Sequence, residues 1–175
     1  MKKIKILTLV VIAISLTFCG TQSEKELFDD ATNLVKEQKY DEAVKLFEQL
    51  VEENAKSDLA PRALFETAKI YQGQVIKNID SRESLLKSVE VYKKIYNTFP
   101  KSEEAENSLF MAAFILANDL SDFANAKESY ELYNKEYPNG KLVRDAKIEL
   151  ENLGKAPEEI LKGKIQEDFT NETTI

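Results

Sequence analysis

A five-residue phrase occurs three times in this chain and constrains its fold more than any other feature. The copies read LFDDA at residues 27–31, LFETA at 64–68 and LFMAA at 109–113. After each copy come a small residue and, four positions later, an aromatic one: Ala43 with Phe47, Ser88 with Tyr92, and Ala126 with Tyr130. Matched phrases at such intervals predict a stacked array of helix pairs.

The spacing inside the phrases has a physical reason. Leu and the Ala four positions later lie on one helical face, and a small residue there lets a second helix pack closely. Ala31 and Ala43 are twelve positions apart, which fits two short helices joined by a turn, and Ala113 and Ala126 are thirteen apart. The second copy stretches this interval to twenty, so we expect about two extra helical turns or a longer loop within residues 73–86.

Composition and local signals predict where the helices begin and end. The chain has five glycines and four prolines in 175 residues, which favours helix over sheet. Asp80 and Ser102 stand at capping positions, Gly154 ends a helix and Pro157 starts the last one. We expect helices over residues 24–37, 41–54, 58–74, 81–98, 103–118, 123–136, 141–153 and 157–162.

These phrases resemble the tetratricopeptide repeat family. The Leu, Ala, small and aromatic residues stand at that family's fourth, eighth, twentieth and twenty-fourth places, and Pro100 and Pro138 lie near its closing proline. The chain departs from the family pattern in having no tryptophan and in the insertion of its second repeat. The resemblance implies an all-α fold, an α-solenoid of about three helix hairpins plus a C-terminal capping helix, over residues 24–163.

The amino terminus has the order of an export signal. Residues 1–5 hold three lysines, residues 6–18 are predominantly apolar, and Cys19 follows. Thirteen residues span about 20 Å as a helix, less than the ~30 Å hydrocarbon core of a bilayer. The sequence at 16–19 resembles a bacterial lipobox, which implies lipidation of Cys19. Cleavage after Cys19, as in an ordinary signal peptide, is the alternative reading.

We therefore divide the chain into a signal peptide at residues 1–18, a tether at 19–23, the repeat domain and a disordered tail at 164–175. Together with the repeats, the amino terminus resembles bacterial envelope lipoproteins of the barrel-assembly and Tol-Pal accessory type. This resemblance implies an exported, lipid-anchored protein of the cell envelope, at the outer membrane and on its periplasmic face.

Charge and residue types argue against several function classes. Without the signal peptide, 21 basic residues remain against 31 acidic ones, a net charge of −10, which disfavours nucleic-acid binding. The chain has no histidine, and its one cysteine lies at the processing site. Its paired carboxylates are adjacent in sequence, so their side chains diverge on a helix. We expect no enzyme, no catalytic or metal-binding residues, no cofactor and no small-molecule substrate.

The remaining candidate is a groove for a protein or peptide partner. In the resembled family the first helices of successive hairpins line a concave surface, and the residue after the motif leucine points toward it. The residues at these and neighbouring positions are Phe28, Thr32, Phe65, Lys69, Gln72, Phe110, Phe114 and Asn118. Aromatic residues at helical spacing can instead be packing residues, and that alternative stays open for the phenylalanines. For the second-helix tyrosines we favour packing.

The preferred function is a membrane-anchored scaffold that binds another envelope protein along this groove, in outer-membrane assembly or envelope maintenance. One alternative is a passive subunit of a larger envelope complex or a homo-oligomer, joined through the second-helix tyrosines or the insertion of the second repeat. An envelope hydrolase is a further alternative, which the missing histidine disfavours.

Overall fold

The computed structural model describes residues 22–163, and within that range the chain forms helices and no strand. Six regular helices and one π-helical segment precede a final labelled helix. Their bounds are α1 Glu24–Lys36, α2 Tyr40–Glu53, α3 Ala60–Gln72, α4 Ser81–Thr98, α5 Glu103–Phe114, η1 Ile115–Asp119, α6 Phe123–Glu136 and α7 Val143–Asn152. Residues 157–163 are also helical.

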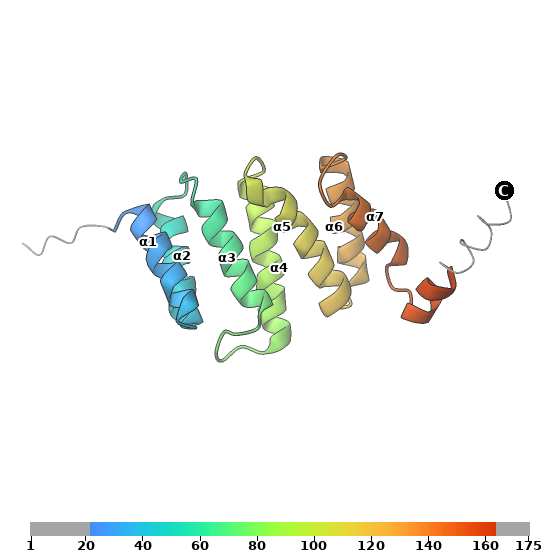
Figure 1. Cartoon of the computed structure of the whole chain (residues 1–175), viewed down its shortest axis with the longest axis horizontal. Helices are drawn as coiled ribbons and strands as arrows, with labels where there is room; N and C mark the ends of the chain where they lie inside the picture. Colours follow the sequence, from blue (N-terminus) through green and yellow to red (C-terminus); the bar gives the residue numbers. More distant parts are fainter. Residues whose placement is uncertain (1–21, 164–175) are drawn as a thin grey trace, which may run out of the picture.

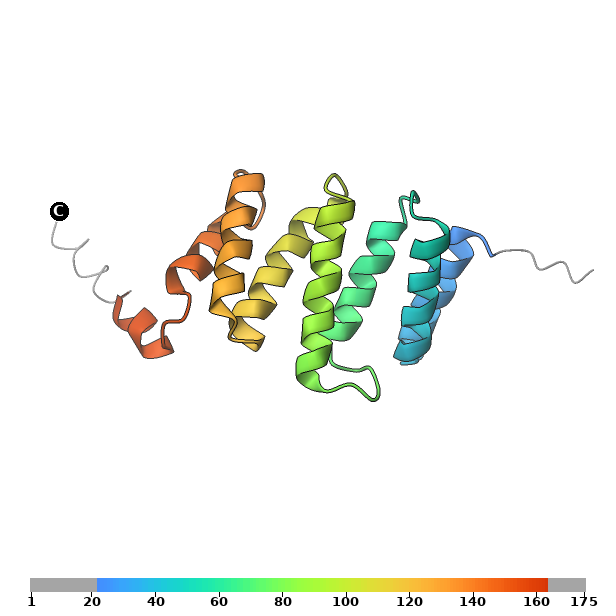
Figure 2. The same ribbon diagram turned by 180° about the vertical axis from the view of Figure 1, so that it is seen from behind.

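The helices form a two-layered array of antiparallel pairs. In Figure 1 the layer of α1, α3, α5 and α7 faces the viewer, and Figure 2 shows α2, α4 and α6 from the other side. Each helix packs chiefly against its neighbours in the chain, as α1 does on α2 and α2 on α3. The predicted α-solenoid of helix hairpins is confirmed. We call the surface formed by α1, α3 and α5 the first-helix face.

Each hairpin closes through the small residues that the sequence singled out. Ala31 and Ala43 are fully buried in the first hairpin, and Ala113 and Ala126 are fully buried in the third. In the second hairpin the Ser88 hydroxyl donates a hydrogen bond to the Ala68 carbonyl oxygen at 2.8 Å. A larger side chain at any of these positions would separate the paired backbones, because the interior is close-packed.

The apolar core runs along the array in two adjoining clusters. Leu27, Phe47 and Leu50 belong to the cluster of the first hairpin, together with residues of α3. The second cluster joins α3 to α7 and contains the fully buried Tyr130 and Tyr133. The partly buried Val51 and Phe99 pack against both clusters, so the hairpins share a continuous interior.

The insertion in the second hairpin consists of a longer loop and a longer helix. Residues 73–80 connect α3 to α4, whereas residues 37–39 are enough to connect α1 to α2. Helix α4 begins seven residues before Ser88, whereas α2 begins three residues before Ala43. Four additional residues make about one helical turn. The insertion therefore combines a longer loop with one extra helical turn, whereas the sequence predicts either a longer loop or about two turns.

The third hairpin absorbs its additional residue in a different way. Helix α5 continues into the π-helical segment η1, in which the Leu120 N–H donates to the Ile115 carbonyl at 3.0 Å. A π turn holds one residue more than an α turn. It accounts for the thirteen-residue interval from Ala113 to Ala126, while the turn that follows has the same length as in the first hairpin. The sequence predicts an uninterrupted α-helix over residues 103–118, and this prediction is wrong from Ile115 onward.

Other expected helix bounds differ from the structure by one or two residues, and one expected cap does not form. Helix α3 begins at Ala60, two residues after the expected start, because the Leu59 N–H is bonded to the Ser57 hydroxyl at 3.0 Å and Pro61 occupies the first helical turn. Ser102 occupies the position before α5, but its hydroxyl makes no capping hydrogen bond. Asp80 does cap α4, since its Oδ1 accepts from the Glu83 N–H at 2.7 Å.

The predicted signal peptide, Cys19 and the predicted tail lie outside the described residues. None of the helices from residue 22 to residue 163 combines the length and the apolar character that a membrane span requires.

Candidate functional site

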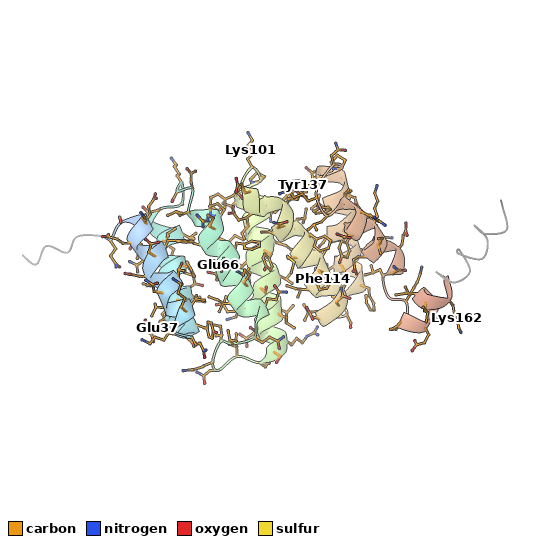
Figure 3. The ribbon with its side chains drawn as sticks, viewed as in Figure 1. Glu37, Glu66, Lys101, Phe114, Tyr137 and Lys162 are labelled. Carbon is orange, nitrogen blue, oxygen red and sulfur yellow. The ribbon has the colours of Figure 1, made fainter. Side chains whose placement is uncertain are left out.

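The predicted groove residues lie on α1, α3, α5 and η1, all in the same layer of the array. Figure 3 shows Glu66 of α3 and Phe114 of α5 on this first-helix face. The structure therefore brings the predicted positions to one surface. Their accessibility differs from helix to helix.

On α1, Phe28 is half-buried and joins two hairpins. Its ring meets the edge of Phe47 at 5.5 Å between centroids, and the Arg62 guanidinium of α3 lies 5.1 Å from the ring centroid. The cation–π contact spans the gap between α1 and α3. The Thr32 hydroxyl donates to the Phe28 carbonyl at 2.8 Å, so its proton is engaged within the helix.

On α3, Phe65 is half-buried with its ring 5.4 Å from that of Tyr92. Lys69 is exposed, and its ammonium lies 2.9 Å from a carboxylate oxygen of Glu66. This exposed pair contributes little to stability. The Gln72 side-chain oxygen accepts a hydrogen bond from the Tyr92 hydroxyl at 3.2 Å. Of these side chains, the Lys69 ammonium is the one most available to a partner.

On α5, the expected role of Phe110 requires a correction. Its side chain is 9% exposed and its ring contacts Tyr130 and Tyr133, each at 5.8 Å between centroids. The two α6 tyrosines enclose its ring, so at this position the packing alternative holds and Phe110 does not line an open groove. Phe114, one turn later, is half-buried and stacks on Phe110 at 6.3 Å.

Asn118 lies in η1 and is exposed. Its side-chain amide donates to the Phe114 carbonyl at 3.2 Å. Together with the half-buried Phe114, the exposed Asn118 forms the accessible part of the α5–η1 surface.

The burial of three second-helix tyrosines confirms that they are packing residues. Tyr92 is 1% exposed, and Tyr130 and Tyr133 are fully buried. Burial raises the pKa of all three hydroxyls above the ordinary value for tyrosine. These three rings cannot form the contact that the homo-oligomer alternative assigned to them. Tyr96 and Tyr137 are half-buried and meet edge to face at 6.4 Å.

Two open hollows flank the α4–α5 loop, at one margin of the array, where Figure 3 labels Lys101. A hollow of about 730 Å³ lies between this loop and the α2–α3 loop, and Arg62 lines it. A second of about 650 Å³ lies between the loop and the α6–α7 loop. Its lining includes Phe65, Glu103, Asn107, Tyr137 and Lys141.

Asn107 and Lys141 are not among the site residues that the sequence predicts. Asn107 lies one turn before Phe110 on α5, so the helical spacing of the groove positions could have identified it. Lys141 lies in a loop, and no periodicity marks it.

A hydrogen-bonded cluster shapes the rim of the second hollow. One oxygen of Glu106 accepts from the Tyr133 hydroxyl at 2.7 Å and from the Lys141 backbone N–H at 2.6 Å. The Leu142 N–H donates to the same tyrosine hydroxyl at 3.1 Å. A side chain at Gly140 would bring its Cβ within 2.6 Å of the Glu106 oxygen. The cluster therefore ties α5 to the α6–α7 loop and delays the start of α7 to Val143.

The groups that the described residues expose distinguish metal binding from contact with a partner. Between residues 22 and 163, no group of three or more potential metal-ligating side chains is placed to hold an ion. Among the predicted groove residues, the accessible groups are the Lys69 ammonium, the Asn118 amide and the edges of aromatic rings. Such groups recognise another polypeptide through hydrogen bonds and apolar contact.

The fold and this surface define an α-solenoid of helix hairpins. Residues 31–57 and 107–140 match the family described as tetratricopeptide repeat. The first match covers part of α1 and all of α2, and the second runs from α5 through α6. The stretch between the matches contains the hairpin with the insertion. No curated protein matches the chain. The matches support the tetratricopeptide family, whose repeats generally serve as non-enzymatic scaffolds for protein–protein interaction.

Proposed function

We propose that this chain is a non-enzymatic scaffold, anchored by a lipid on Cys19, that binds another envelope protein or peptide on its first-helix face. The tetratricopeptide matches support the coarser part of this proposal, a protein-interaction scaffold. The export signal and the lipobox-like sequence support the anchoring and the envelope location. The proposed role is in outer-membrane assembly or envelope maintenance, at the periplasmic face of the outer membrane.

One structural observation carries the choice of surface. The first-helix face presents the partly accessible rings of Phe28, Phe65 and Phe114 among exposed polar groups such as Lys69 and Asn118. Rigid aromatic rings beside hydrogen-bonding side chains form the usual centre of a protein-binding surface. The hollow that Phe65 lines adds a concave region next to these rings.

A pair of matched double variants tests this choice. The change K69E with N118R alters two exposed positions of the first-helix face, and K94E with N97R makes the same chemical changes on exposed positions of α4 in the other layer. The full chain and both variants are expressed in cells, recovered from solubilised membranes, and the proteins that accompany them are quantified by mass spectrometry.

We expect K69E/N118R to lose its partner at least tenfold and K94E/N97R to keep it. Circular dichroism should show equal helicity in all three proteins, since all four positions are exposed. Equal partner recovery by the two variants would rule out the first-helix face as the binding surface.

A further inference from the structure

The last labelled helix carries an exposed stripe that the scaffold function does not use. Arg144, Ile148 and Glu151 are all exposed on α7, and Ile148 is 40% exposed. They follow one another at intervals of four and three residues, so they lie along one face. Ala146 is fully buried against the core. Ile148 is two residues, or about 200°, further around the helix and therefore points away from the core.

This stripe lies where the array ends. Helix α3 packs against α2, α4 and α5, but the chief packing of α7 among the labelled helices is against α6. Figure 1 shows α7 as the last member of the two-layered array, with the helix of residues 157–163 beyond it. A hollow of about 380 Å³ separates the two and is lined by Arg144, Ile148, Glu151 and Ile160. The stripe forms one wall of this hollow and residues 155–163 form the other, and with both in place Ile148 is still 40% exposed.

The order of charges along the stripe is self-complementary. A cation stands one turn before Ile148 and an anion about one turn after it. If two copies of α7 lie antiparallel about a two-fold axis between positions 147 and 148, Arg144 of each copy lies opposite Glu151 of the partner subunit. Both ion pairs then form at once around the two isoleucines. A two-fold interface of this kind uses the same surface on both subunits and closes on itself.

We propose that the exposed stripe of α7 is a homodimerisation surface that joins two solenoids through their C-terminal ends. A single helix of ten residues is a small contact, below the size of stable interfaces. The dimer is therefore weak, and the average mass of the chain should rise with its concentration. The first-helix faces of both copies stay free, so the dimer would present two binding surfaces.

Charge exchange tests this arrangement. Sedimentation equilibrium measures the mass of the full chain in density-matched detergent over a wide concentration range. R144E should weaken dimerisation about tenfold or more, because both symmetric pairs become repulsive, and E151R should do the same. The double exchange R144E/E151R restores opposite charges at both pairs and should return the dissociation constant to within about threefold of the original.

A control variant and three outcomes complete the test. L86S changes another exposed apolar residue, 45% exposed on α4, and should leave dimerisation unchanged. Circular dichroism checks that every variant keeps its helicity. The proposal fails if the unaltered chain is monomeric at all concentrations or if R144E dimerises as well as the unaltered chain. Masses that grow beyond the dimer would also overturn it, because they would indicate head-to-tail association.

Discussion

Two buried tyrosines on α6 allow a stringent test of how the third hairpin is held. Tyr130 and Tyr133 are both fully buried, and both rings lie 5.8 Å from Phe110. Their hydroxyls differ. The Tyr133 hydroxyl donates to Glu106 at 2.7 Å and accepts from the Leu142 N–H at 3.1 Å, whereas the Tyr130 hydroxyl has no hydrogen-bond partner within residues 22–163.

Replacing each tyrosine by phenylalanine isolates its hydroxyl. A hydrogen bond to a charged group contributes about 1.5–3 kcal/mol, and Tyr133→Phe also leaves the Leu142 N–H without its acceptor. We expect Tyr133→Phe to lower the free energy of unfolding by about 2 kcal/mol. Tyr130→Phe removes a buried hydroxyl that makes no bond, so the free energy of unfolding should be unchanged or should rise by up to about 1 kcal/mol.

Urea denaturation followed by circular dichroism at 222 nm measures both changes at pH about 7, where both tyrosines are neutral. Each phenylalanine variant is the control for the other, because the ring, the helix and the burial are matched. Equal losses of stability in the two variants, or a larger loss for Tyr130→Phe, would refute the assignment of the Glu106 cluster as the tie between α5 and the α6–α7 loop.

Four further predictions concern local features. Gly140→Ala should lower the melting temperature, because its Cβ would lie 2.6 Å from the Glu106 oxygen and 2.9 Å from the Tyr137 Cβ; calorimetry measures this. Gln38→Gly should raise the free energy of unfolding by about 1 kcal/mol in urea denaturation, because Gln38 has a φ of 60° in the α1–α2 turn. Hydrogen bonds from Ser23 and Asn125 hold the pKa of Glu26 and Asp122 below their ordinary values of 4.5 and 3.8. The stability that these caps contribute should therefore be lost as the pH falls below those values, and thermal unfolding from pH about 7 to 3 measures this loss. Cys19→Ala should move the protein from the membrane pellet to the soluble fraction after cell fractionation, and an unchanged pellet would count against lipid anchoring.

Much of the architecture followed from local signals. Helices α4 and α6 have the expected bounds. Asp80 and Asp122 cap their first turns, and each side chain accepts a hydrogen bond from the backbone N–H three residues later. The buried small pairs follow from the four-residue spacing that repeats three times. The additional residue between Ala113 and Ala126 was visible in the sequence, but its absorption in a π turn was not, because the neighbouring helices determine where the residue fits.

The accessibility of the candidate site depends on contacts distant in the sequence. Phe110 occupies the same repeat position as Phe28 and Phe65, but the two tyrosines that bury it belong to α6. Glu106 and Lys141 are 35 positions apart, so no local pattern predicts their hydrogen bond. Sequence reasoning can place a residue on a helix face. Whether that residue is exposed depends on side chains contributed by other helices.

Site-specific photo-crosslinking tests the central claim, that the first-helix face is the binding surface. A photoreactive residue is placed at Lys69 or Asn118 on this face, and at Lys94 or Asn97 on α4 as controls, in the full chain expressed in cells. Irradiation should produce the same specific adduct from positions 69 and 118 and none from 94 and 97. Adducts from the α4 positions alone, or equally from both layers, would contradict it.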